Sequence, residues 1–393
     1  MSDLRIARVT ATPLRLDVPA APYATDGAGT RIHWDGRRSR ETPLRPTPML
    51  EYVIARIETE DGHFGVGEAT VDIGFFGETL EQARAAITDY LGPQLVGRDP
   101  FDREQLMWLI DFRGNSTAKS AIDMALHDLC GRVAGVPVTD LIGGRCRDRV
   151  RVAIEIAGGS PDGMAARCVE LVALGVTAFK PKIGGDPRRD AERLIAIREA
   201  VGADVVLRAD ANQGFTPKQA IELCRLADEG SVDLELLEQP VAAWDHEGMA
   251  FVRRSVETLI EADESCYSPN DAMALVRAGA CDVLNVKLGK AGGLLAAKKI
   301  AAVAEAAGVG CVLGTAFAVG PELAAKLHLA ASIPIAVDAV EFTELSLHPT
   351  ILAPPYDALF ALPLEDGCLP VPTGPGLGVE LDAAAMARYA LAS

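Results

Sequence analysis

The chain has 393 residues, a formal net charge of −17 and a hydrophobic content of 49%. This length suits a barrel with a smaller second domain, and the acidic balance argues against nucleic acid, because phosphates need a basic surface. The first residues contain no long apolar core, and the longest uncharged stretch, 306–321, is broken by glycines and a proline. We therefore expect no signal peptide, no membrane span and a cytoplasmic protein.

The eight cysteines are scattered along the chain, and none forms a C-x-x-C pair. A protein of this size rarely depends on a disulfide framework, and a zinc site would need clustered ligands. We therefore interpret the cysteines as free thiols that pack as small apolar residues.

A polar segment at about residues 19–48 is too long for an ordinary connection. It is either a solvated loop or a lid over an anion, and Arg31 and Arg37 are its candidate substrate contacts. Residues 49–69 alternate apolar and polar around Asp61-Gly62 and predict a hairpin. A helical pattern then leads to Gly135, a plausible C-cap. We assign residues 1–145 to a small α+β domain.

From about Arg149, short β-branched runs alternate with Ala/Leu/Glu-rich helical runs. Eight runs are predicted strands: 151–157, 178–182, 204–210, 234–238, 258–263, 282–287, 308–313 and 339–344. The alternation favours parallel strands with helical crossovers, and the number of strands favours a closed barrel over residues 146–345. The proline-rich remainder, 346–393, is expected to return to the first domain.

Carboxylates end three consecutive barrel strands, at Asp210, Glu238 and Asp263. The carboxyl ends of barrel strands share one mouth, where active sites lie. Three carboxylates there would repel one another without a cation, and hard oxygen ligands suit Mg²⁺. Any one of these acids alone is more often a surface or capping residue, but the repeated position predicts a metal site.

Lysines end two other strands, Lys180 and Lys182 on the second and Lys287 on the sixth. Residues i and i+2 of a strand point to one face, so Lys180 and Lys182 both reach the mouth. Each disfavours the charge on the other, which could leave one neutral near pH 7 as a general base. Lys287 would face them across a planar intermediate. The alternative is that these lysines are rim residues paired with acids.

This combination predicts removal or delivery of a proton α to a carboxylate. That proton is weakly acidic, and the enolate needs preorganised positive charge, which a metal on the substrate carboxylate supplies.

The motifs "KPK", "DANQ", "EQP", "ADES" and "VKLGKAGG", with "PGLG" near the end, resemble the enolase superfamily and its muconate lactonizing enzyme subgroup. The resemblance implies a (β/α)7β modified TIM barrel with an N-terminal α+β capping domain completed by the C-terminal segment. It implies that Asp210, Glu238 and Asp263 hold Mg²⁺, or Mn²⁺ in its place. Lys182 would be the base, Lys287 the acid or base on the other face, and Lys180 a supporting group. The family further implies a homo-oligomer, often an octamer.

Other features bear on the substrate. Residues 309–320 contain no histidine, which disfavours the mandelate racemase branch. Ala316 and Ala318 stand where relatives carry acids, so neither a free ammonium group on the substrate nor muconate itself is well matched. Asn212, Thr315 and Phe317 are further candidate substrate contacts.

We therefore expect a Mg²⁺-dependent isomerase for a small anionic carboxylate, first a muconate-type cycloisomerase. The alternative is a racemase or epimerase of an N-substituted amino acid or betaine, which needs two proton-transferring lysines where the cycloisomerase needs one. A syn-dehydratase, a Schiff-base aldolase and a non-catalytic binding protein are the remaining alternatives.

Overall fold

The computed structural model describes residues 4–17, 31–32, 38–39 and 49–391. The predicted lid at about residues 19–48 lies outside the described residues, except for the short pair β2 (Arg31–Ile32) and β3 (Arg38–Ser39). Among the helices within these ranges, none has the length and apolarity to cross a membrane.

The N-terminal domain is built on an antiparallel sheet of order β1-β4-β5. Its strands are β1 (Ile6–Asp17), β4 (Met49–Thr59) and β5 (Phe64–Val71). The predicted hairpin is confirmed: β4 and β5 pair across a turn in which Gly62 has φ +86°. The other elements are α1 (Leu80–Ala85), the π-helix η1 (Ala86–Leu91), the 3₁₀ helix η2 (Gly92–Gln94), α2 (Arg103–Leu109), α3 (Ser116–Ala134) and α4 (Val138–Leu141).

The long helix α3 packs directly on β5. A Cβ atom at Gly65 would lie 2.2 Å from the Ala125 carbonyl oxygen, and one at Gly67 would lie 2.0 Å from that of Ala121. Only glycine therefore permits this close approach. The helix ends at Gly135 with φ +71°, which confirms the predicted C-cap.

Eight barrel strands occur where the sequence predicts them. They are β6 (Arg149–Ile156), β7 (Ala178–Pro181), β8 (Val206–Asp210), β9 (Leu234–Glu238), β10 (Leu259–Ala262), β11 (Val283–Val286), β12 (Gly310–Leu313) and β13 (Val340–Glu341). Their pairings are parallel in the order β12-β11-β10-β9-β8-β7-β6-β13. Residues 335–337 close the barrel by pairing with β12 at Cys311.

The last barrel strand is shorter than the predicted 339–344. Beyond β13 the chain forms the 3₁₀ helix η3 (Thr343–Ser346). The Thr343 hydroxyl accepts a hydrogen bond from the Glu155 amide at 2.9 Å. A side chain therefore replaces the ladder bond that would have continued the strand.

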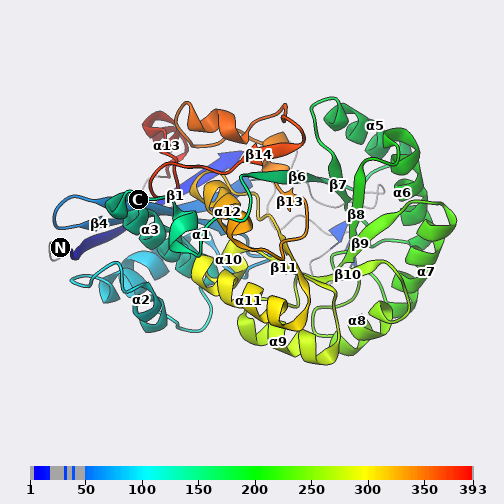
Figure 1. Cartoon of the computed structure of the whole chain (residues 1–393), viewed down its shortest axis with the longest axis horizontal. Helices are drawn as coiled ribbons and strands as arrows, with labels where there is room; N and C mark the ends of the chain where they lie inside the picture. The colour runs from blue at the N-terminus through cyan, green and yellow to red at the C-terminus, as the bar shows by residue number, and fades with distance from the viewer. Residues whose placement is uncertain (1–3, 18–30, 33–37, 40–48, 392–393) are drawn as a thin grey trace.

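Seven helices connect the barrel strands. They are α5 (Pro161–Val172), α6 (Pro187–Val201), α7 (Pro217–Glu229), α8 (His246–Arg253), α9 (Pro269–Ala278), α11 (Leu294–Ala307) and α12 (Pro321–Ser332), with the short α10 (Leu288–Ala291) before α11. Four begin with a capping residue followed by proline, at Ser160, Asp186, Thr216 and Ser268. The backbone N–H that proline lacks would have no partner in the first turn of a helix. A capping residue followed by proline therefore favours the start of a helix. Figure 1 shows α5 to α9 forming the outer wall of the barrel.

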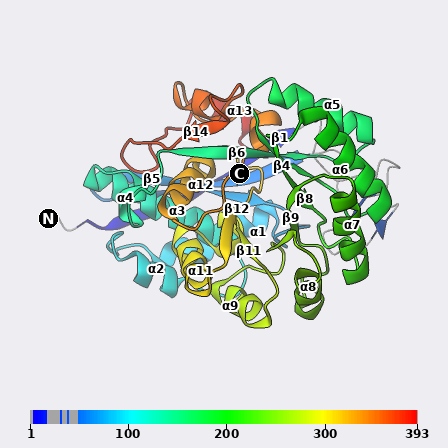
Figure 2. The same cartoon turned by 45° about the vertical axis from the view of Figure 1, so that its right-hand side comes forward.

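The C-terminal segment contains η4 (Tyr356–Phe360), β14 (Cys368–Pro370) and α13 (Ala383–Tyr389). β14 pairs with β6, and the Leu391 amide donates to the Pro13 carbonyl of β1 at 3.0 Å. The capping domain is thus completed by the end of the chain, as the red helix α13 beside the blue strand β1 shows in Figure 2.

Candidate active site

Lysines and carboxylates converge at the carboxyl ends of the barrel strands, as predicted. Asp210 and Glu238 are the last residues of β8 and β9, and Asp263 and Lys287 directly follow β10 and β11. All four are at least nine-tenths buried. Buried charge is costly unless it is paired, so the pairing decides what the site can do.

Lys180 of β7 and Lys182, which directly follows the strand, point to the same side. Both ammonium groups contact the same oxygen, Glu155 Oε1 on β6, at 3.3 and 2.8 Å. Lys182 also contacts Asp210 Oδ2 at 2.6 Å, whereas Lys180 contacts Glu238 and the Glu341 carboxylate of β13. The predicted common orientation is confirmed.

Lys287 is held on the opposite side of the barrel by Asp263. Its Nζ contacts Asp263 Oδ2 at 2.5 Å, and Lys290 of α10 takes the other oxygen, Oδ1, at 2.5 Å. Lys290 also donates to the carbonyls of Asp263 and Asn285, at 2.7 and 2.9 Å. Lys182 is therefore paired with Asp210 at the end of β8, and Lys287 is paired with Asp263 directly after β10.

The sequence predicts lowered lysine pKa values, but the carboxylates around Lys182 and Lys287 raise them. Burial and the neighbouring Lys180 do lower the pKa of Lys182, but Asp210 and Glu155 outweigh them and raise it. Burial likewise lowers the pKa of Lys287, but the opposite effect of Asp263 and Glu238 is larger, so the pKa is raised. Because acids outnumber lysines around the site, the charged lysines are favoured.

Sequence reasoning missed six polar residues that complete the cluster: Glu155, Glu261, Glu264, Asn285, Lys290 and Glu341. A signal was available for two of them. Glu261 and Asn285 lie two residues before Asp263 and Lys287, so strand alternation places them on the same face, one layer deeper. Asn285 Nδ2 donates to Glu261 at 3.0 Å and to Glu238 at 3.2 Å.

The donor set suits a hard divalent cation. Burial and Asp210 raise the pKa of Glu238, and burial with Asp263 and Asp210 raises that of Glu264 to about 8. Glu264 Oε2 and Glu261 Oε2 are buried without a hydrogen-bond partner. Carboxylates that repel one another and keep unpaired oxygens are those that a cation would stabilise.

Two ligand sets compete for this role. Within the described residues, Glu238, Glu261 and Glu341 each bring one oxygen within 4.8 Å of the others. The predicted set of Asp210, Glu238 and Asp263 shares Glu238 with this group. Its two aspartates instead form ion pairs with Lys182 and Lys287. Lys180 contacts both Glu238 and Glu341, so an ammonium group already lies at the deeper set.

The predicted substrate contacts are distributed unevenly. Asn212 Nδ2 donates to Glu264 at 3.2 Å at the mouth. The buried Thr315 donates to Glu344 and accepts the Phe317 amide at 3.0 Å in the loop after β12. The side chains of Arg31 and Arg37 lie outside the described residues.

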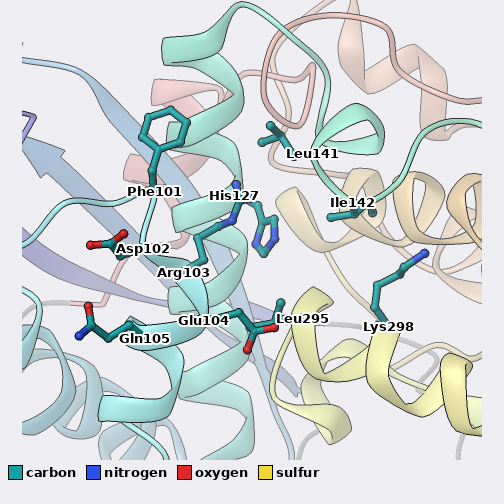
Figure 3. A pocket seen from close by; sticks show the side chains of 10 residues that line it. All are labelled: Phe101, Asp102, Arg103, Glu104, Gln105, His127, Leu141, Ile142, Leu295 and Lys298. Atoms are coloured by element: carbon teal, nitrogen blue, oxygen red, sulfur yellow. The ribbon is translucent and has the colours of Figure 1, made fainter. Parts of the chain in front are cut away.

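A separate cavity of about 440 Å³ lies between α2, α3, α4 and α11. Figure 3 shows Arg103 and His127 at its centre, with Leu295 and Lys298 on the barrel side. Its lining includes none of the strand-end acids or lysines, so it is distinct from the candidate active site.

Comparisons with known proteins identify the family of the chain. Residues 163–385 match the family described as "Enolase C-terminal domain-like", and residues 40–143 match "Mandelate racemase / muconate lactonizing enzyme, N-terminal domain". The chain is 36% identical over 342 residues to an L-Ala-D/L-Glu epimerase of Clostridium acetobutylicum, covering 86% of this chain and 94% of that one.

Two crystal structures are similar over nearly the whole chain. The N-succinyl Arg/Lys racemase of Bacillus cereus has a TM-score of 0.85 at 27% identity, covering 99% of this chain and 98% of that one. A muconate lactonizing enzyme of Pseudomonas fluorescens, complexed with muconolactone, has a TM-score of 0.85 at 31% identity, covering 98% and 99%.

The fold, a barrel with a capping domain, and the site, with lysines and carboxylates at the strand ends, together define one class of enzyme. The chain belongs to the enolase superfamily, of the mandelate racemase and muconate lactonizing enzyme type, and is an isomerase. The predicted family and fold are confirmed. The preference for a cycloisomerase is not: the relatives support the racemase or epimerase alternative at least as well.

Proposed function

We propose that the protein is a Mg²⁺-dependent racemase or epimerase of an N-acyl α-amino acid. The observation that carries this proposal is the symmetry of the two lysine–aspartate pairs, Lys182 with Asp210 and Lys287 with Asp263. Inversion at one carbon needs a proton acceptor on one face and a donor on the other, whereas cycloisomerisation needs one proton-transferring group. Lys180 contacts three glutamates and supports Lys182 as a fixed positive charge.

In this proposal Lys182 removes the α-proton on one face and Lys287 delivers a proton on the other. Asp210, Glu238 and Asp263 would hold Mg²⁺, which stabilises the negative charge that develops on the substrate carboxylate. The charged form of the lysines would be stabilised less if these carboxylates shared their charge with a cation. This weaker stabilisation would bring the pKa of the accepting lysine toward the range of a general base.

The loop after β12 favours a substrate whose N-substituent carries no free ammonium group. The relatives include epimerases of dipeptides and an N-succinyl-L-Arg/Lys racemase, whose substrates share an amide nitrogen on an α-carbon beside a carboxylate. The acids that contact the loop after β12 are already engaged: Glu341 with Lys180, and Glu344 with Thr315 and Lys326. An N-succinyl amino acid therefore fits better than a dipeptide.

Proton NMR in D₂O with Mg²⁺ tests the proposal. The compounds are N-succinyl-L-arginine, L-Ala-L-Glu and cis,cis-muconate. We expect loss of the α-proton signal of N-succinyl-L-arginine together with racemisation, and no reaction after EDTA treatment.

Lys182→Ala and Lys287→Ala should each lower racemisation by about 10²–10⁴-fold, the usual contribution of a general acid or base. Each should keep exchange from only one enantiomer, because one face still has its lysine. Lactone formation from muconate without any racemisation would refute the proposal in favour of the cycloisomerase, which the likeness to the muconate lactonizing enzyme supports.

A further inference from the structure

The loop after the seventh barrel strand, residues 314–320, is held from two sides. On the barrel side, the Thr315 amide donates to Glu341 Oε2 at 3.1 Å, and Glu341 Oε1 contacts Lys180 Nζ at 2.5 Å. The Phe317 amide donates to the Thr315 hydroxyl at 3.0 Å. A continuous series of hydrogen bonds therefore joins this loop to the lysine pair.

The backbone of the loop is strained at its centre. Phe317 has φ +63°, a left-handed conformation that costs a residue with a side chain about 1–2 kcal/mol. Such a conformation persists only where the surroundings determine it. Thr315 of the barrel holds the amide of Phe317, and the capping domain holds its carbonyl.

The first anchor is Tyr52 of β4. Its side chain is fully buried, and its hydroxyl donates to the Phe317 carbonyl at 2.6 Å. Burial, followed by Glu68, Glu344 and Glu322, raises the pKa of Tyr52, so the hydroxyl keeps the proton that it donates.

The second anchor is Glu68 of β5. Its carboxylate accepts the amides of Val319, Gly320 and Glu322 at 2.7, 2.9 and 3.1 Å, where the loop enters α12. Thr70 of the same strand donates to Glu322 at 3.0 Å. Val319 precedes α12, Gly320 is its N-cap and Glu322 lies in its first turn, so Glu68 of another domain caps the start of the helix.

We infer that Tyr52 and Glu68 of the capping domain are positioning residues, which fix the loop 314–320 and the Glu341–Lys180 contact in the arrangement that substrate binding requires. Neither anchor is among the strand-end lysines and acids. The kinetic part of this inference rests on the proposed function, and the structural part does not.

The test uses Tyr52→Phe, with Tyr90→Phe as the matched control, because Tyr90 of η1 is 68% exposed. Hydrogen–deuterium exchange of the peptide 314–322 is measured without ligand, and kcat and KM are measured with N-succinyl-L-arginine. We expect Tyr52→Phe to raise the exchange rate and the KM about two- to tenfold, as loss of one hydrogen bond predicts, with kcat within twofold of the parent. Glu68→Gln should raise the exchange rate further, because its amide group cannot accept all three backbone amides.

Values of Tyr52→Phe equal to those of Tyr90→Phe would overturn the inference. Faster exchange of the loop with unchanged KM would also overturn it, because the anchors would then be structural only. Where the parent protein does not turn over N-succinyl-L-arginine, the proposed function fails separately, and the exchange of the loop alone decides whether the anchors hold it. Tyr52→Phe keeps the test valid where Glu68→Gln does not fold.

Discussion

The choice between the two carboxylate sets gives a sharp prediction. Asp263 and Glu261 lie two residues apart at the end of β10, and each belongs to only one set. We expect Asp263→Asn to weaken Mg²⁺ binding at least 100-fold and Glu261→Gln to weaken it less than fivefold. The reason is that Lys180 already occupies the deeper set through Glu238 and Glu341.

The magnitude follows from the charge that is removed. Two unit charges 4 Å apart interact by about 4 kcal/mol at an effective dielectric constant of 20. A divalent cation would interact more strongly with the carboxylate than a single charge does. The change to Asn keeps an oxygen ligand, however. We therefore expect a loss of about 3 kcal/mol in the free energy of Mg²⁺ binding, or roughly 100-fold in affinity.

Isothermal titration calorimetry with Mg²⁺ at pH 9 measures this difference. At that pH, protons do not compete strongly, since burial raises the pKa of Glu261 to about 7 and that of Glu264 to about 8. Asp210→Asn serves as a second variant of the predicted set, because Asp263→Asn also removes a partner of Lys290. Strong weakening by Glu261→Gln with little effect of both aspartate variants would refute the reasoning and assign the cation to the deeper set.

Two further predictions concern stability. Burial lowers the pKa of His328 from 6.5 to about 4, so between these pH values only the unfolded chain takes up the proton. The free energy of unfolding should therefore fall by about 3 kcal/mol from this group as the pH drops from 6.5 to 4. In urea titrations at pH 7, 5.5 and 4.5, His328→Gln should show a shallower decline, and an unchanged decline would contradict the assignment. Gly175→Ala and Gly62→Ala both place alanine at φ near +87°, but only the first puts a Cβ 2.4 Å from a backbone oxygen, that of Leu364. Thermal unfolding should show a loss of about 1 kcal/mol for Gly62→Ala and at least 1–2 kcal/mol more for Gly175→Ala, whereas equal losses would show that the contact relaxes freely.

The barrel was readable from the sequence because its signals are local. Each strand is a short apolar run, and helices α5, α6, α7 and α9 start at a capping residue followed by proline. The strand-end position of Asp210, Glu238, Asp263 and the lysines follows from the same periodicity. The carboxyl ends of parallel strands must meet at one mouth, so their convergence needed no coordinates.

The partners of those residues depend on distances between strands, which periodicity does not contain. Glu155 and Glu341 come from β6 and β13, which are neighbours only because the barrel closes. Glu238 and Glu341 raise the pKa of Lys180, and Asp210 and Glu155 raise that of Lys182, against the direction expected from the sequence.

The contacts between domains are equally hidden in the sequence. Tyr52 and Phe317 are 265 positions apart, and nothing in either local pattern indicates a hydrogen bond. The sequence by itself thus determined the elements, the family and the placing of lysines and carboxylates at the strand ends. Only the tertiary structure decided which charges neutralise one another and which domain holds the loop, because electrostatic energies and hydrogen bonds depend on separation in space.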